Sequence, residues 1–425
     1  MNESVFTYAA PRLRFGAGAA DELWYDLERM GARRVLVVTD PRVLATGVPQ
    51  RVAAQVRAHG GEAVVHDSAH VEPTDASLDA AVARARADGP FDAVLAVGGG
   101  SAIDTAKAVD LLLTNPGDLM DYINAPIGRA RPPQHPLLPL IAVPTTTGTG
   151  AESTTICVLD VLSLHVKTGI SHERLRPALA VVDPRLTMTQ PAGVTASAGM
   201  DILCHALESW TARPYDSYPR KAPQERVPYC GANPVADLWA ERSLSLLARA
   251  FRPAVRDGDD ETARADMALA ATFAGLGFGN AGVHVPHANA YPIAGRVRGF
   301  HPRDYPQEEP MVPHGMAVAM TAPEAFRWTF AAGPERHLAA AELLDPQRRG
   351  PWDGPPQDLL PAILIDLMRE IGLPSGLGAV GYGESDVEAL VEGALKQQRL
   401  LAMSPRTVTA EDLAGIITRS LRLWD

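Results

Sequence analysis

Cysteine is scarce in this sequence: only Cys157, Cys204 and Cys230 occur among 425 residues, and no two of them form a CxxC pair. A disulfide framework and a thiolate metal site are therefore not indicated. Long apolar runs are also missing, because no stretch approaches the roughly 20 residues that a helix needs to cross a bilayer. We expect a protein without disulfides and without membrane-spanning segments.

Positive charge is in the minority, with 39 Lys and Arg against 50 Asp and Glu and a formal net charge of −11. No block of five or more like charges stands out, so nucleic acid is not an expected partner. The first residues, MNESVFTYAAPRLRFG, lack the pattern of a secretory signal and the Arg- and Ser-rich bias of a transit peptide. The sequence thus predicts a cytoplasmic protein.

The length exceeds what one hydrophobic core usually supports, so two domains are expected. Up to about residue 190, short β-branched runs alternate with amphipathic segments, a pattern typical of a parallel sheet with helices on its faces. We predict an α/β domain over residues 1–190, with strands at 34–39, 62–66, 93–97, 140–143 and 179–182.

After Pro191 the pattern changes to helical periodicity with few convincing strands, which predicts an all-helical domain over residues 191–425. The expected helices in this domain cover 235–251, 259–278, 334–344, 359–371 and 384–401. Stretches rich in Pro and Gly, or otherwise irregular, predict long loops at 122–139, 212–233, 295–313 and 345–356.

A glycine turn, Gly98-Gly99-Gly100-Ser101, follows an apolar strand and opens a helix. Glycines allow backbone N–H groups to approach a phosphate closely, and a helix N-terminus favours negative charge. A pyrophosphate site and a plain strand-to-helix turn both fit these residues. A second loop, 144–153, contributes threonine hydroxyls and two glycines after another predicted strand, at the edge where open α/β sheets bind ligands.

Asp40 ends the first strong strand, where a carboxylate can accept hydrogen bonds from an adenosine ribose. The same carboxylate would repel a 2′-phosphate, which favours NAD over NADP. A helix cap or turn residue is the alternative interpretation of Asp40.

One carboxylate and four histidines recur in apolar segments of the second half. Asp201 and His205 are four residues apart, which places both on one helix face. His284, His287 and His314 follow. Together they are enough for a divalent-cation site of one Asp and three His, although each histidine alone is also compatible with a hydrogen-bonded core residue.

Taken in order, these segments resemble the iron-containing alcohol dehydrogenase family. The resemblance covers nearly the whole chain and rests on GGGSAIDTAKA at 98–108, PTTTGTGAEST at 144–154, DPRLT at 183–187, GMDILCHALE at 199–208, HANAYPIAG at 287–295 and PHG at 313–315. It implies an α/β dinucleotide-binding N-terminal domain followed by an all-helical metal-binding domain, the fold shared with dehydroquinate synthase.

The resemblance also implies roles for single residues. The family's ligands for Fe²⁺, or alternatively Zn²⁺, fall on Asp201, His205, His287 and His314. The residues that it implies for NAD binding are Asp40, Gly98, Gly99, Gly100, Ser101, Asp104, Thr145, Thr146, Thr149 and Lys167.

The chain departs from many family members at Tyr291, where they carry a second histidine close to the nicotinamide. Tyr291, His284-Val-Pro-His287, the segment 229–234 and the connection 295–313 resemble the hydroxyacid-oxoacid transhydrogenase subgroup. The catalytic candidates are Tyr291, which either relays the hydroxyl proton or packs on the cofactor, together with His284 and Lys167.

The resemblance therefore implies a metal-dependent, NAD-linked oxidoreductase acting on the CH–OH group of a hydroxyacid or alcohol, with 4-hydroxybutyrate and 2-oxoglutarate as the type of substrate pair. Small molecules are the expected partners, and a homo-oligomer is expected. Carboxylate substrates require a cationic side chain, for which Arg213, Lys221, Arg296 and Arg298 are candidates.

Two other enzyme classes remain open. The first is a simple NAD-dependent alcohol dehydrogenase or aldehyde reductase, which releases its cofactor in each turnover. The second is a dehydroquinate-synthase-like lyase, which the Asp and three His disfavour because that family's pattern uses a Glu with two His.

Overall fold

The computed structural model describes residues 1–164, 166–346 and 352–425. The chain forms two compact units. One is the continuous segment Ala10–Gln190, and the other combines Met1–Ala9 with Pro191–Asp425. Residues 1–9, which the sequence assigns to the α/β domain, therefore belong to the second unit.

A six-stranded parallel sheet forms the centre of the α/β unit, with the strand order β1-β8-β5-β4-β2-β3. Every neighbouring pair is parallel. Its strands are β1 (Arg12–Phe15), β2 (Arg34–Val38), β3 (Glu62–His66), β4 (Ala93–Gly98), β5 (Leu140–Pro144) and β8 (Leu179–Val182). Five of them lie where the sequence predicts strands, and β1 was not predicted.

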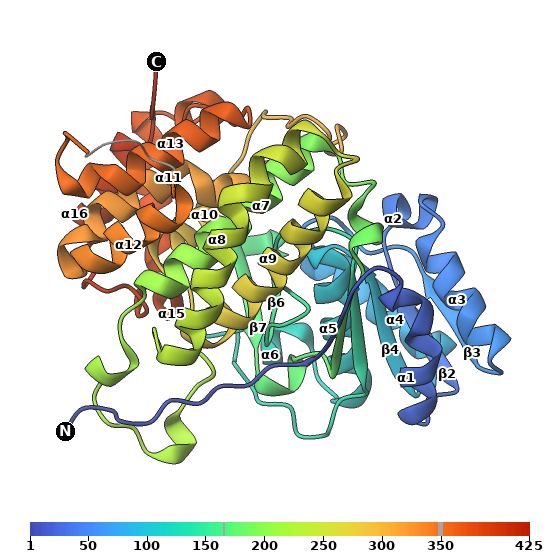
Figure 1. The fold of residues 1–425 in the computed structure, drawn as a ribbon. Coiled ribbons are helices and arrows are strands. Elements are labelled where there is room, and N and C mark those ends of the chain that lie inside the picture. Colours follow the sequence, from blue (N-terminus) through green and yellow to red (C-terminus); the bar gives the residue numbers. More distant parts are fainter. Residues whose placement is uncertain (165, 347–351) are drawn as a thin grey trace. The chain divides into compact units, whose positions relative to one another are not determined.

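Alternate residues of the central strands pack on opposite faces of the sheet. Leu36 and Val38 of β2 belong to one hydrophobic core, and Val35 and Val37 belong to the other. Because strand side chains alternate between faces, both faces of the sheet must be covered. The first face is covered by α4 (Asp75–Asp88) and α5 (Gly100–Thr114), and the second by α1 (Leu23–Arg29) and α3 (Val48–Ala58), as Figure 1 shows.

The α/β unit also contains an antiparallel hairpin that the sequence did not predict. It consists of β6 (Ile156–Val161) and β7 (Val166–Ser171), paired from Ile156–Ser171 to Val161–Val166. The short helices α2 (Pro41–Ala45) and α6 (Leu119–Tyr122) complete the α/β unit.

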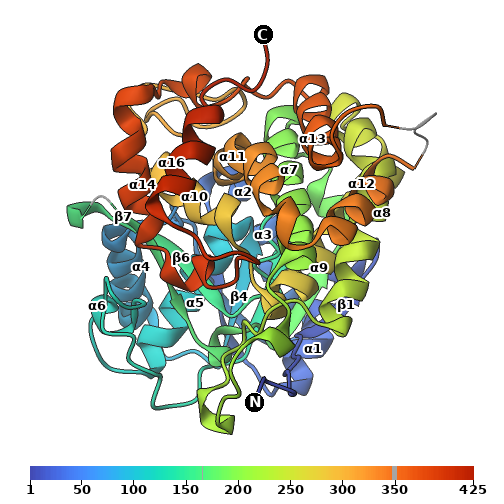
Figure 2. The same cartoon turned by 90° about the vertical axis from the view of Figure 1, so that its left-hand side faces the viewer.

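The second unit is mostly helical, which confirms the predicted fold class. Its helices are α7 (Ala192–Thr211), α8 (Pro234–Arg256), α9 (Glu261–Ala281), α10 (Val285–Gly295), α11 (His314–Thr329), α12 (Pro334–Leu344), α13 (Leu359–Glu370), α14 (Val387–Leu395), α15 (Gln398–Leu401) and α16 (Ala410–Arg419). Helix α10 packs on α11 and α14, and α16 contacts α11 and α14 (Figure 2).

Two predictions for this unit need correction. The helix expected at 384–401 is a 3₁₀ turn followed by α14 and α15. The segment 212–233, predicted as a loop, contains two 3₁₀ turns, Tyr215–Ser217 and Pro223–Glu225. Of the loop predicted at 345–356, residues 347–351 lie outside the described residues.

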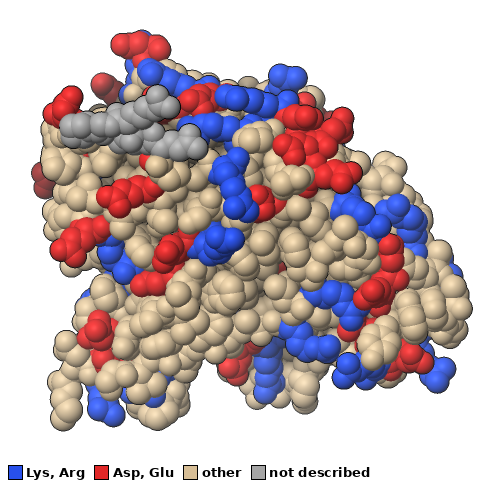
Figure 3. Space-filling view, in the orientation of Figure 1, with Lys and Arg blue, Asp and Glu red and all other residues tan. Residues whose placement is uncertain are grey.

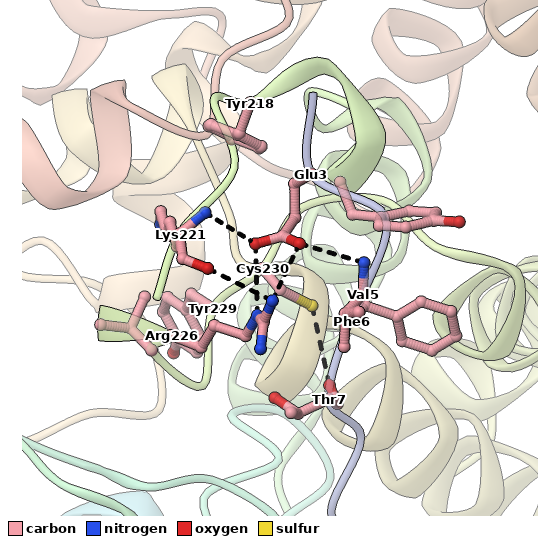
Figure 4. Close-up of a pocket in the computed structure, with 11 residues that line it drawn as sticks. Glu3, Val5, Phe6, Thr7, Tyr218, Lys221, Arg226, Tyr229 and Cys230 are labelled. Carbon is pink, nitrogen blue, oxygen red and sulfur yellow. Dashed lines mark hydrogen bonds and ion pairs between the residues drawn. The ribbon is translucent and has the colours of Figure 1, made fainter. Parts of the chain in front are cut away.

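The segment Met1–Ala9, which we call the N-terminal strap, lies on the 212–233 segment. Arg226 donates to both carboxylate oxygens of Glu3, at 3.1 and 3.2 Å, and the backbone N–H of Lys221 donates to the same carboxylate at 3.1 Å (Figure 4). The Arg226 guanidinium lowers the pKa of Glu3 from its ordinary value of 4.5 to about 2. Paired recognition of this kind holds a carboxylate in its charged form.

The surface in Figure 3 carries basic side chains interspersed with acidic ones. Among the described helices, no single one is long and apolar enough to cross a bilayer, and α9 and α10 meet that test only as a pair bent by 104°.

We expect acid to release the N-terminal strap. Since the pKa of Glu3 is lower in the folded protein than its ordinary 4.5, the stabilisation is present at higher pH and is lost as the pH falls from about 4.5 towards 2. The Glu3→Gln variant should therefore melt below the wild type at pH 7, and the gap should close on acidification. Thermal melts across pH test this, with the exposed Glu241→Gln as control. A gap that is independent of pH would contradict the role given to Glu3.

Candidate functional site

Helix α7 carries three charged or titratable side chains on one face. Asp201, His205 and Glu208 follow one another at spacings of four and three, so helical geometry stacks them in successive turns. All three are buried, with exposed fractions of 1%, 4% and 0%. Such burial requires that each polar group finds a partner inside the helical unit.

Gly315 brings the first turn of α11 onto α7. A Cβ at this position would lie 2.1 Å from Ser197 O and 2.8 Å from Asp201 Cβ, so only glycine permits the contact. The hydroxyl of Ser197 accepts a hydrogen bond from Met316 N at 3.0 Å and fixes the same junction. His314, the first residue of α11, is thereby turned towards Asp201.

Glu208 fixes the start of α10. Its Oε1 accepts hydrogen bonds from the backbone N–H groups of His284 at 2.7 Å and His287 at 3.3 Å. Its Oε2 pairs with Nδ1 of His287. The other ring nitrogen of His287, Nε2, is consequently directed away from Glu208 and towards Asp201.

Three imidazoles converge on one carboxylate oxygen. From Asp201 Oδ1, the Nε2 atoms of His287, His205 and His314 lie at 3.4, 3.7 and 3.9 Å. The candidate ligand atoms of Asp201, His287 and His314 all lie within 4.8 Å of one another. Ligand atoms bound to a small divalent cation at about 2.0–2.2 Å are separated by roughly 3.3–3.6 Å in tetrahedral geometry.

Two atoms at the centre of this group lack a hydrogen bond. Asp201 Oδ1 and His287 Nε2 are buried and have no hydrogen-bond partner in the part of the chain that the structure describes. In folded proteins, buried polar atoms are almost always hydrogen-bonded. A metal ion therefore suits this arrangement, because it would bind both atoms at once.

Burial and charge set the protonation of these groups. Burial lowers the pKa of His205 to about 3, so its imidazole is neutral at pH 7, which is the form that binds metals. For His287, burial acts in the same direction, but the carboxylates of Glu208 and Asp201 outweigh it and raise the pKa to about 9. Burial favours a protonated Asp201, yet the surrounding imidazoles keep its pKa below the usual range.

His284 and Tyr291, the two other candidates in the helical unit, contact different groups. His284 Nε2 lies 3.0 Å from the hydroxyl of Thr211, and burial lowers its pKa to about 4. Tyr291 follows His287 by one helical turn, and its ring lies edge-on to that of His314, at 6.2 Å between centroids. Of the two, Tyr291 is the one in ring contact with a predicted ligand.

In the α/β unit, the glycine turn and the threonine loop pack directly on each other. A Cβ on Gly99 would lie 2.9 Å from Thr146 Oγ1, and one on Gly100 would lie 2.7 Å from Thr149 Oγ1. The first turn of α5 has no side-chain cap, so its N–H groups remain for another acceptor. The backbone N–H of Thr145 donates to Gly98 O at 3.0 Å and joins the ends of β5 and β4.

Asp40 is the cap of α2, which was the alternative interpretation of its role. Its Oδ1 accepts hydrogen bonds from Arg42 N at 2.9 Å and Val43 N at 3.0 Å. Its Oδ2 lies 3.6 Å from the position that a Cβ on Gly98 would occupy. The cap therefore still leaves one carboxylate oxygen beside the glycine turn.

Asp104 and Lys167 are engaged with other protein groups. Asp104 Oδ2 accepts a hydrogen bond from Val158 N at 3.0 Å, and burial raises its pKa to about 6. Lys167 Nζ lies 2.6 Å from Glu72 Oε2 and 2.7 Å from Asp160 Oδ2. Burial alone would lower the pKa of Lys167, but these two carboxylates raise it above its ordinary value.

The four candidate cations for substrate carboxylates lie in different settings. Arg213 stacks on Tyr218 and, with Arg406, lines a surface cavity of about 540 Å³ in the helical unit. Lys221 lies 5.6 Å from the same Tyr218 ring, and Arg298 pairs with Asp386. Arg296 is half-buried.

The sequence patterns of the iron-containing alcohol dehydrogenase family match both units. The model of iron-containing alcohol dehydrogenases covers residues 10–184, and that of the C-terminal region of Fe-containing alcohol dehydrogenases covers 225–421. This chain belongs to the iron-containing alcohol dehydrogenase family and is an oxidoreductase of that type.

Within the family, the chain is similar over its length to one particular enzyme. It is 42% identical to the mitochondrial hydroxyacid-oxoacid transhydrogenase of Bos taurus, over 99% of this chain and 90% of the relative. Among solved structures, a 1,3-propanediol oxidoreductase is 30% identical, with a TM-score of 0.84 over 98% of this chain and 100% of that one. Sulfoacetaldehyde reductase from Bifidobacterium kashiwanohense, in complex with NAD⁺, is 28% identical, with a TM-score of 0.80 over 97% and 98% of the two chains.

The prediction of a cytoplasmic protein is contradicted by these relatives, because the bovine, rat and human transhydrogenases are named mitochondrial. That prediction rested on the lack of a leader pattern in the first residues. Such a lack carries no information about the compartment.

Glu208 is a functional candidate that the sequence analysis missed. We expect Glu208→Gln to weaken metal binding about 10- to 100-fold, because the neutral amide no longer holds the His287 ring with its Nε2 towards Asp201. Equilibrium dialysis against Fe²⁺ and Zn²⁺ measures this, with the exposed Glu342→Gln as matched control. Equal metal affinity in both variants would show that Glu208 only packs the start of α10.

Proposed function

We propose that this chain is a hydroxyacid-oxoacid transhydrogenase that uses NAD(H) together with a divalent metal. The observation that carries the metal assignment is the convergence of His205, His287 and His314 on Asp201 Oδ1. The 42% identity over almost the whole chain supports the reaction type.

Asp201, His205, His287 and His314 would hold the metal. One carboxylate and three imidazoles suit both Fe²⁺ and Zn²⁺, and iron is favoured because the family is iron-containing. When bound, a divalent cation lowers the pKa of an alcohol hydroxyl and so favours loss of its proton. Glu208 orients His287, and Gly315 places His314, so the protein presents its ligands already arranged.

NAD would bind at the glycine turn of the α/β unit. A Cβ at Gly99 or Gly100 would fill the space that the threonine loop now occupies, and the uncapped first turn of α5 favours a phosphate. The free oxygen of Asp40 beside Gly98 suits a ribose hydroxyl and repels a 2′-phosphate. The sulfoacetaldehyde reductase of the same fold has NAD⁺ bound, which supports the choice of cofactor.

Tyr291 is the candidate to exchange the proton of the substrate hydroxyl, since its ring contacts that of His314. Arg213 is the preferred candidate for the substrate carboxylate. Arg213 lines a cavity whose described lining residues include no acidic side chain, and its guanidinium donates to Ser217 Oγ at 3.0 Å and Ser217 O at 2.9 Å, whereas Arg298 is neutralised by Asp386.

We expect His314→Ala to remove most of the bound metal and to abolish turnover, because one of four converging ligands is lost. The matched control is His301→Ala, an exposed histidine, which should retain metal and activity. Metal analysis of the purified variants decides the assignment. A wild-type metal content in His314→Ala would show that His314 is not a metal ligand.

The reaction itself is tested with 4-hydroxybutyrate and 2-oxoglutarate. If the cofactor stays bound between the two half-reactions, purified protein should carry NAD(H) through gel filtration. It should then convert the pair with ping-pong kinetics and without added NAD. A different result would be turnover that requires stoichiometric free NAD, with no exchange between hydroxyacid and oxoacid. It would indicate a simple NAD-dependent alcohol dehydrogenase.

A further inference from the structure

Glu72 adopts a backbone conformation that its side chain disfavours. Its φ is +58°, in the left-handed region, which L-residues with a Cβ rarely enter. A residue held in such a conformation persists only where its surroundings determine it strongly. Glu72 lies in the segment between β3 and α4, next to the first turn of α5, so its surroundings are informative.

The carboxylate of Glu72 is held by a buried cation. Lys167 Nζ lies 2.6 Å from Glu72 Oε2, and only 1% of the Lys167 side chain is exposed. Asp160 holds the same ammonium at 2.7 Å, while its own backbone N–H donates to Pro73 O at 2.8 Å. The β6–β7 hairpin therefore binds the side chain of Glu72 through Lys167 and the backbone of Pro73 through Asp160.

The backbone N–H of Glu72 donates to the hydroxyl of Ser101 at 3.1 Å. A serine hydroxyl has one proton to donate and two lone pairs that accept. Since Glu72 occupies a lone pair, the proton of Ser101 remains for another acceptor. Ser101 is the last residue of the glycine turn and the second residue of α5, whose first turn has no side-chain cap for its N–H groups.

We propose that Glu72 is a positioning residue for the cofactor phosphates. Lys167 anchors its side chain, and the N–H of its strained backbone orients the Ser101 hydroxyl so that its proton is donated to a phosphate bound at the glycine turn. This inference rests on the proposed use of NAD(H). Lys167 then acts through Glu72 and Ser101, and not by touching the cofactor itself.

The variant Glu72→Gln separates two explanations, because a pure charge effect and a positioning role change NAD⁺ binding in opposite directions. Removing the negative charge of Glu72 near a pyrophosphate should strengthen NAD⁺ binding if charge alone matters. If Glu72 positions Ser101, Glu72→Gln loosens the anchor, and NAD⁺ binding weakens by about tenfold, the share of one hydrogen bond to a charged group.

The experiment is titration of the purified full-length protein, after its bound NAD(H) has been removed, with NAD⁺ and, separately, with adenosine, which lacks phosphates. We expect Glu72→Gln to weaken NAD⁺ but not adenosine, and the double variant with Ser101→Ala to bind NAD⁺ no more weakly than Ser101→Ala alone. Glu62→Gln is the matched control, because Glu62 also pairs with a cation in this unit, Arg34 at 3.3 Å. The Glu62→Gln variant should bind NAD⁺ and adenosine as the wild type does.

Glu72→Gly provides a second route if Glu72→Gln folds poorly, because glycine adopts φ +58° without strain and keeps the N–H but loses the anchor. It should also weaken NAD⁺ selectively. Unchanged or tighter NAD⁺ binding, equal losses for NAD⁺ and adenosine, or additive effects in the double variant would overturn the role of Glu72. A wild type that binds neither ligand would instead overturn the proposed function.

Discussion

The helical unit is organised around the buried carboxylate of Asp201. A carboxylate away from water is stable in its charged form only when nearby groups compensate it. Here imidazoles on α7, α10 and α11 face the carboxylate, and the raised pKa of His287 on α10 favours its charged form, so these helices can pack in only a narrow set of arrangements. The close contact at Gly315 and the hydrogen bonds of Glu208 both serve that arrangement.

Much of the fold was predictable because its elements have local signatures. Central strands such as β4 read as continuous apolar runs, since both faces of the sheet are covered. The elements that escaped lack such signatures. In β1, Arg12 and Arg14 alternate with apolar residues and pair with Asp26, so the strand reads as polar. Helix α10 is buried on all sides from Val285 to Ile293, so it shows no amphipathic period.

The residues of the candidate site also fall into those that a local sequence pattern reveals and those that only the folded chain brings together. The spacing of Asp201 and His205 reveals a shared helix face, and the glycine and threonine loops reveal neighbouring strand ends. Glu208 carried a weaker signal, its position seven residues after Asp201. Its partners His284 and His287 lie 76 and 79 residues further on, and no local pattern encodes such pairing. Lys167 was noticed, but its capture by Glu72, 95 residues away, is likewise a property of the folded chain alone.

The division of the chain has a consequence for its synthesis. The α/β unit is one continuous segment, so it is complete when Gln190 leaves the ribosome. The strap is made before the α/β unit, yet Arg226, which donates to the carboxylate of Glu3, appears more than 200 residues later. At roughly 5–20 residues per second, Glu3 waits on the order of 10 to 45 s for its partner. The strap residues are translated before the α/β unit but bind their partner only after it, so the nascent chain must keep them accessible while that unit folds.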